Sequence, residues 1–139
     1  MSNPNDSGQI SQDRVLAGRL RQAIETTFAR DSDLLRRGWL VDTYCLIEIG
    51  AVQLVLTIRG GRPTVADRVP LLASWEFAIR AGAEAWTALW QPMPKAGWHA
   101  LFALTRRGAM RIEGRLQPFM ANLQYFKDLV TLPREGSPR

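Results

Sequence analysis

The chain has 139 residues, of which 46% are hydrophobic and 22% charged, a composition typical of one globular domain with a single substantial core. Its one cysteine, Cys45, excludes an internal disulfide and a multi-cysteine metal site, and is expected to be a small buried apolar side chain. No segment reaches the roughly 18 apolar residues of a membrane span, and the polar first ten residues lack the apolar run of a secretory signal. We therefore expect a cytoplasmic protein without an integral membrane span.

The net charge of +5, with an isoelectric point near 10.3, would suit an anionic partner. The arginines, however, are scattered along the chain. Only two adjacent basic pairs occur, Arg36-Arg37 and Arg106-Arg107, and neither belongs to a longer basic run of the kind that marks a nucleic-acid interface. We therefore expect no nucleic-acid partner.

The first half of the chain predicts a helix followed by a hairpin. Ser11 can cap a helix whose apolar residues recur at helical spacing as far as Phe28. Residues 40–49 and 52–59 alternate between apolar and polar side chains on either side of a glycine turn, which predicts an antiparallel pair. Residues 62–69 carry a proline that cannot donate to a ladder, which favours a short edge strand.

The second half alternates strands with short helices. Residues 72–80 alternate between apolar and polar side chains, which predicts a strand with one face exposed to solvent. Ala73, Trp75, Phe77 and Ile79 are expected to lie together on the other face. Helices are then predicted over 83–90 and 97–107, a strand over 110–116 and a last amphipathic helix over 118–132. The predicted fold is α+β, with a five-stranded, mostly antiparallel sheet covered by helices. We expect one domain over 10–133, between a disordered tail (1–9) and a polar tail (134–139).

Catalytic chemistry is not indicated by the sequence. His99 is the sole histidine, so multi-histidine metal sites are excluded within one chain. Glu76 and Glu113 fall on the polar strand faces, and Glu84 falls in a helical first turn where it offsets the dipole. A buried dyad of His99 with Glu76 or Asp128 would be needed for a cavity enzyme, and no spacing predicts it. We predict no catalytic residue, no metal and no cofactor.

The order of these segments resembles the sterol carrier protein 2-like lipid-binding domain over roughly residues 39–133. The matching stretches are Leu72-Ala-Ser-Trp-Glu-Phe-Ala-Ile79, Ala83-Glu-Ala-Trp-Thr-Ala-Leu89, His99-Ala-Leu-Phe-Ala-Leu104 and Ala109-Met-Arg-Ile-Glu-Gly114. The sharpest match is the tripeptide Ile112-Glu113-Gly114, because it ends a strand between two helices. The resemblance implies a non-enzymatic module that holds a fatty acid, an acyl-CoA or a sterol-like lipid.

The interpretation of the chain as a container for such a ligand rests on large apolar side chains in its second half. We expect them to line a cavity between sheet and helices: Trp75, Phe77, Trp86, Leu89, Trp90, Trp98, Leu101, Phe102, Met110, Ile112, Phe119, Met120, Leu123 and Phe126. A polar anchor for an acidic head group would come from His99, Arg106, Arg107 and Arg111. The alternative is a protein-interaction or dimerisation module beside a lipid-processing enzyme, without a ligand of its own.

Overall fold

The computed structural model describes residues 4–69, 74–92 and 101–134, and its centre is a five-stranded sheet. The strand order is β3-β2-β1-β4-β5; β1 and β4 run parallel, and the other neighbouring pairs are antiparallel. The predicted α+β class with a mostly antiparallel sheet is therefore confirmed. The strands are β1 (Thr43–Ile49), β2 (Val52–Arg59), β3 (Arg62–Ala66), β4 (Phe77–Ala81) and β5 (Met110–Gly114).

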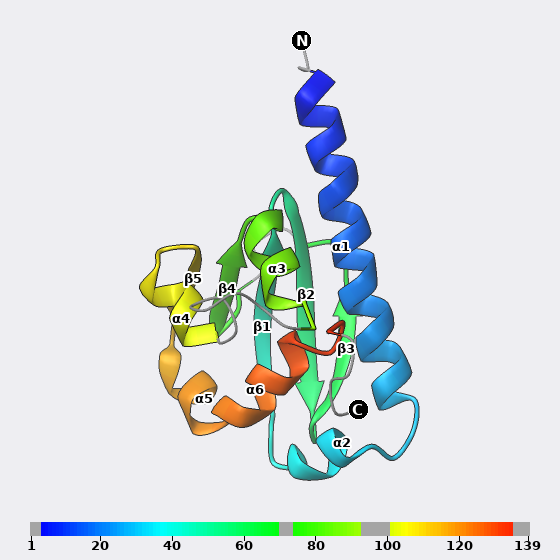
Figure 1. Ribbon diagram of the computed structural model, residues 1–139. Helices are drawn as coiled ribbons and strands as arrows, with labels where there is room; N and C mark the ends of the chain where they lie inside the picture. The colour runs from blue at the N-terminus through cyan, green and yellow to red at the C-terminus, as the bar shows by residue number, and fades with distance from the viewer. Residues whose placement is uncertain (1–3, 70–73, 93–100, 135–139) are drawn as a thin grey trace.

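Helices cover one face of this sheet, as Figure 1 shows. The long α1 lies over the β2–β3 side, while α3 and α6 lie over the middle and α4 and α5 stand at the β5 edge. Within the described residues these helices are α1 (Pro4–Phe28), α2 (Asp33–Arg37), α3 (Ala83–Leu89), α4 (Leu101–Arg106), α5 (Leu116–Ala121) and α6 (Leu123–Val130). None of the helices in the described ranges is both long and apolar enough to cross a bilayer.

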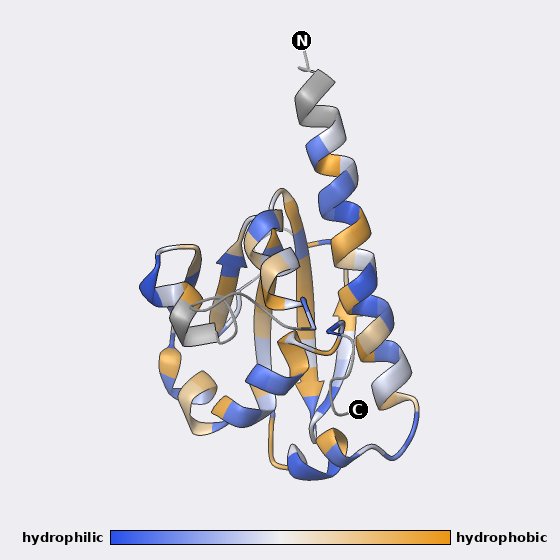
Figure 2. Cartoon of the chain, in the orientation of Figure 1, coloured by the Kyte–Doolittle hydropathy of each residue, from blue (hydrophilic) through white to orange (hydrophobic). Residues whose placement is uncertain are grey.

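The main hydrophobic core lies between the sheet and these helices. Residues at alternate strand positions, such as Ile47 and Leu56, meet Leu20 of α1 and Trp86 of α3, and all four are at most 1% exposed. The strands appear orange at their centres in Figure 2, as expected of segments that bury apolar side chains. A smaller cluster of Leu46, Val55 and Ala78 lies on the opposite face, against Tyr44, Val69 and Trp75.

The α1 helix starts earlier than the sequence predicts. It begins at Pro4, so residues 4–9 of the predicted disordered tail are helical, and residues 1–3 lie outside the described part. Proline suits a first helical turn because the amide it lacks would be unpaired there. Further along, Asp13 is 1% exposed and its carboxylate accepts from the Ala51 amide at 3.0 Å. This contact fixes α1 to the β1–β2 hairpin.

Three other boundaries differ from the predictions for local reasons. β1 begins at Thr43 instead of residue 40, because the Val41 amide donates to the Gly38 carbonyl at 2.8 Å and closes a turn. β5 ends at Gly114, whose φ of 100° breaks the strand, and α5 follows from Leu116. The predicted last helix is two helices, since Asn122 (φ −126°, ψ 37°) is non-helical between α5 and α6.

Candidate functional site

Three phenylalanine rings form the centre of the predicted ligand-binding region. Phe77 of β4, Phe119 of α5 and Phe126 of α6 are each at most 1% exposed. Their ring centroids lie 5.5 Å (Phe77–Phe119), 5.0 Å (Phe77–Phe126) and 5.8 Å (Phe119–Phe126) apart. Both pairs that involve Phe77 are edge-to-face, the geometry that the ring quadrupoles favour. We call these residues the phenylalanine trio; their rings pack against one another at the β4 side of the core.

The α3 residues of the predicted site also pack into the core. Trp86, Leu89 and Trp90 are at most 3% exposed. The indole N–H of Trp86 donates to the Glu48 carbonyl at 2.9 Å, and that of Trp90 donates to the Val130 carbonyl at 2.8 Å. Because burying an indole N–H without a partner is costly, these bonds fix the two rings in place. They connect α3 to β1 and to the end of α6.

At the β5 edge, several large apolar side chains of the described residues are only partly covered. Met110 is buried, but Ile112, two residues on, is only half-buried, because β5 is an outer strand of the sheet. Leu116 and Met120, one turn apart on α5, are 46% and 52% exposed. Leu123 at the start of α6 is half-buried and packs on the core. We call Ile112, Leu116, Met120 and Leu123 the β5–α5 rim.

Four predicted residues have side chains outside the described part of the chain. Trp98 and His99 belong to residues 93–100, which precede α4. Leu101 and Phe102 are in α4, but their side chains are likewise outside the described set. Of this stretch the structure describes the α4 backbone, and α4 packs beside β5.

Trp75 does not share a face with Phe77, which corrects the predicted alternation. β4 begins only at Phe77, so Trp75 lies before the strand, where the period of two does not apply. Its half-buried ring packs with Leu46, Val55 and Ala78 on the face away from the main core. The guanidinium carbon of Arg80 lies 5.8 Å from the centroid of that ring. Trp75 is therefore separated from the phenylalanine trio by the sheet itself.

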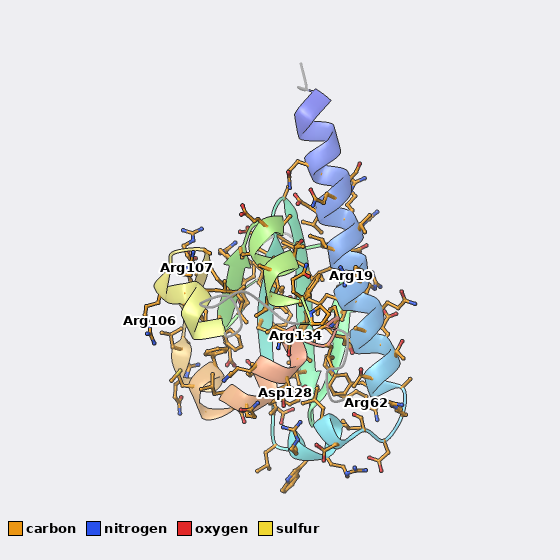
Figure 3. The ribbon with its side chains drawn as sticks, in the orientation of Figure 1. Arg19, Arg62, Arg106, Arg107, Asp128 and Arg134 are labelled. Carbon is orange, nitrogen blue, oxygen red and sulfur yellow. The ribbon has the colours of Figure 1, made fainter. Side chains whose placement is uncertain are left out.

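The predicted arginine anchors lie at different places. Arg106 and Arg107 are exposed at the end of α4, and Figure 3 shows both at the outer edge of the molecule. Arg111 alternates with the inward-facing Met110 and Ile112 and so points to the opposite sheet face, where its Nη1 pairs with Glu113 Oε1 at 3.3 Å. Arg111 cannot reach a ligand on the helix-covered face, which leaves Arg106 and Arg107 as the described candidates.

Buried titratable groups near the trio are held in their neutral forms. Burial, with a smaller contribution from Glu76, raises the pKa of Cys45 to about 12. Burial, followed by the nearby Cys45, raises the pKa of Tyr125, whose hydroxyl donates to the Gly61 carbonyl at 2.6 Å. A thiol with such a pKa is not nucleophilic at neutral pH.

Glu76 differs from its predicted place on a polar strand face. It precedes β4, and its carboxylate accepts from the hydroxyl of the buried Thr43 at 3.1 Å. Asp128, the other carboxylate considered for a dyad with His99, pairs with Arg37 at 2.9 Å. No group of three potential metal-ligating side chains occurs within the described ranges.

Two described grooves lie along α1, away from the predicted site. The larger, about 430 Å³, has an apolar floor and an arginine-rich border; it is lined by Arg14, Ala17, Gly18, Arg21, Val52, Leu54, Asp67 and Arg68. The second, about 360 Å³, lies between α1 and Pro133. Neither includes a predicted ligand-binding residue. The sequence analysis did not identify this groove; the feature that could have indicated it is Gly18 within a helical pattern, where a β-carbon would meet open space.

Comparisons with known proteins support the fold. Neither a protein-family model nor a curated protein matches the sequence. Among solved structures, a crystal structure of sterol carrier protein 2 is 14% identical with a TM-score of 0.61, covering 85% of this chain and 95% of that one. The sterol carrier protein domain 2 of Helicoverpa armigera is 13% identical with a TM-score of 0.55, covering 94% and 93%.

A further match is a structure described as "UbiJ-SCP2 Ubiquinone synthesis protein", which is 20% identical with a TM-score of 0.55 and covers 86% of this chain and 95% of that one. At these identities the likeness concerns the arrangement of helices and strands. The chain therefore has the sterol carrier protein 2-like fold that its sequence resemblance implied.

Proposed function

We propose that this protein binds and carries a hydrophobic ligand, such as a fatty acid, an acyl-CoA or a sterol-like lipid, without catalysis. The observation that carries the proposal is the shared fold with a sterol carrier protein 2 structure over 85% of this chain. We place the ligand between the phenylalanine trio and the α4 layer, with the β5–α5 rim at its entrance.

The exposure of the rim supports this placement. Leu116 and Met120 hold large apolar side chains 46% and 52% exposed on a six-residue helix whose inner face carries the buried Phe119. Apolar side chains that stay in contact with water beside a half-buried edge strand are a feature of ligand entrances and of interfaces. A ligand that enters here would cover Ile112 and Leu123 as well.

The energetics require both a long apolar tail and a polar contact. Each buried methylene contributes about 0.8 kcal/mol, so a ten-carbon chain would gain on the order of 8 kcal/mol. Association costs roughly 4 to 15 kcal/mol, so at most about 4 kcal/mol remains, which corresponds to millimolar binding without an anchor. Arg106 and Arg107, exposed at the α4 end beside β5, are the described groups proposed to bind a carboxylate or phosphate.

The ligand test begins with the purified protein. Native mass spectrometry followed by solvent extraction should reveal a co-purified lipid, and fatty acids, sterols and a polyprenylated quinone would be tested by displacement of a fluorescent fatty acid. The quinone is included because one structural neighbour is described as a ubiquinone synthesis protein. Absence of any lipid, together with no displacement by any of these compounds, would contradict the proposal.

A matched pair of variants tests the entrance. Leu116→Glu/Met120→Glu places two carboxylates on the rim and should weaken fatty-acid binding at least tenfold, because a charged entrance opposes an anionic, apolar ligand. Val15→Glu, on a 63% exposed residue of α1, is the control and should bind as the wild type does. Equal losses in both variants would show that the rim is not the entrance.

An interaction or dimerisation module is the second candidate, and the same exposed pair on α5 favours it. Exposed apolar side chains one turn apart can form a contact between protein chains as readily as an entrance. The solution mass, measured with and without fatty acid, separates the candidates. A dimer whose mass does not change when fatty acid is added, and that dissociates in Leu116→Glu/Met120→Glu, would favour the interaction module over the carrier.

A further inference from the structure

The most exposed large apolar side chains among the described residues are two neighbours, Trp39 and Leu40. They are 67% and 70% exposed, in the connection between α2 and β1. The Val41 amide donates to the Gly38 carbonyl at 2.8 Å, so Trp39 and Leu40 occupy the two central positions of a four-residue turn. We call residues 38–41 the Trp39 turn. Figure 1 places α2 and this connection at the end of the molecule opposite the amino terminus.

This turn is held rigidly by its surroundings. Tyr125 of α6 packs so closely on Gly38 that a β-carbon at Gly38 would collide with its ring. The Gly61 amide donates to the Val41 carbonyl at 3.0 Å, and the Gly60 amide donates to Asp42 Oδ1 at 3.1 Å. The turn and the β2–β3 hairpin therefore form one joined surface. Because the backbone of the turn is already fixed, little conformational entropy is lost when its two side chains bind a partner.

The aspartates near the turn already have partners, so several nearby arginines form no ion pair among the described residues. Asp31 pairs with Arg36, whereas Asp33 and Asp128 both pair with Arg37. The Asp42 carboxylate accepts from a backbone amide. Within the described ranges, three exposed arginines at this end form no ion pair: Arg30, Arg59 and Arg62. Figure 3 shows Arg62 at this end of α1, where it donates to the Phe28 carbonyl.

We propose that the Trp39 turn docks this protein on the surface of an anionic lipid bilayer. Trp39 and Leu40 would insert at the level of the head groups, where an indole places its apolar body and its polar N–H most favourably. Arg30, Arg59 and Arg62 would attract anionic phospholipids. The combination of two exposed apolar side chains with these nearby arginines matches a surface that is apolar in its interior and anionic at its head groups. The proposal stands apart from the proposed ligand site at the other edge of the sheet.

Sedimentation of the full chain with vesicles of phosphatidylcholine and phosphatidylglycerol tests the docking. Trp39→Ala/Leu40→Ala should reduce the bound fraction at least tenfold, because the two insertable side chains are lost. Ile10→Ala/Val15→Ala removes exposed apolar side chains from α1 and is the matched control, expected to bind as the wild type does. Arg59→Gln/Arg62→Gln should weaken binding by more than tenfold at low salt, at about fivefold per arginine, and by less as salt is raised.

Tryptophan fluorescence supplies an independent measurement. A blue shift on adding vesicles should occur in the wild type and be absent in Trp39→Phe, which keeps an apolar ring for insertion. Unchanged sedimentation of Trp39→Ala/Leu40→Ala, or a wild-type blue shift in Trp39→Phe, would overturn the proposal. So would a solution dimer that dissociates in Trp39→Ala/Leu40→Ala, since the turn would then join two copies. Fatty-acid binding by the docking variants is expected to be unchanged, which separates this proposal from the proposed function.

Discussion

Replacing Phe119 tests how much the packing of the phenylalanine trio contributes to stability. Its ring is 1% exposed and contacts Phe77 and Phe126 at 5.5 and 5.8 Å between centroids. Truncating a buried phenylalanine to alanine typically costs about 3 to 5 kcal/mol through lost transfer energy and the cavity that remains. The six-residue α5 is exposed on its outer side and can partly collapse into that space. We therefore expect Phe119→Ala to lower the free energy of unfolding by about 3 kcal/mol.

Urea unfolding followed by circular dichroism measures this loss, and Phe119→Leu, which keeps most of the apolar volume, should cost roughly 1 kcal/mol. A loss below about 1 kcal/mol for Phe119→Ala would refute the reasoning, since a ring against open space has few contacts to lose. The same samples should be assayed for fatty-acid affinity. If the ring is one wall of the proposed site, as we infer, affinity should fall in Phe119→Ala beyond what partial unfolding explains.

Two further predictions concern buried polar groups. The folded pKa of Cys45, about 12, lies above its ordinary value of 9.0, so stability is complete below pH 9 and should decline above it by about 1.4 kcal/mol per pH unit. Urea titrations from pH 8 to 11 should show this decline in the wild type and a shallower one in Cys45→Ala; identical slopes would exclude the thiol as its source. Asp13→Ala removes the buried acceptor of the Ala51 amide and should cost about 1 to 3 kcal/mol in thermal unfolding, whereas Asp13→Asn, which keeps an acceptor, should cost less.

The fold was largely predictable because local patterns and the sheet agree. The alternation in residues 43–49 and 52–59 specified a hairpin, and its register pairs Cys45 with Leu56 and Ile47 with Leu54 on the buried face. Every second side chain of a strand lies on the same face. A shift of the strand pairing by one residue would therefore move all of these apolar side chains to the solvent-exposed face. The α3 helix was equally well marked, because Gly82 precedes it and Pro92 follows it, whereas the predicted last helix is divided at Asn122 into α5 and α6.

The candidate site was less predictable because its placement depends on where strands begin and end. Phe77, Phe119 and Phe126 were expected together, and the structure brings them together through tertiary packing of β4, α5 and α6. Trp75, only two residues before Phe77, lies on the other face because the chain bends at Glu76 before β4 begins. Strand alternation identifies a shared face only inside the ladder, and the sequence contains no sharp signal for the residue at which a ladder starts.

The α6 helix gives the two proposed surfaces a common support. Its consecutive residues Tyr125 and Phe126 lie edge-to-face at 5.2 Å, with Tyr125 against Gly38 of the Trp39 turn and Phe126 against Phe77 in the trio. Changes to exposed residues at either surface should act separately, because they leave this helix in place. Changes to α6 itself should alter both surfaces, since close-packed interiors transmit displacement instead of absorbing it. The proposed docking and ligand-binding surfaces therefore have separate contacts but share one structural element.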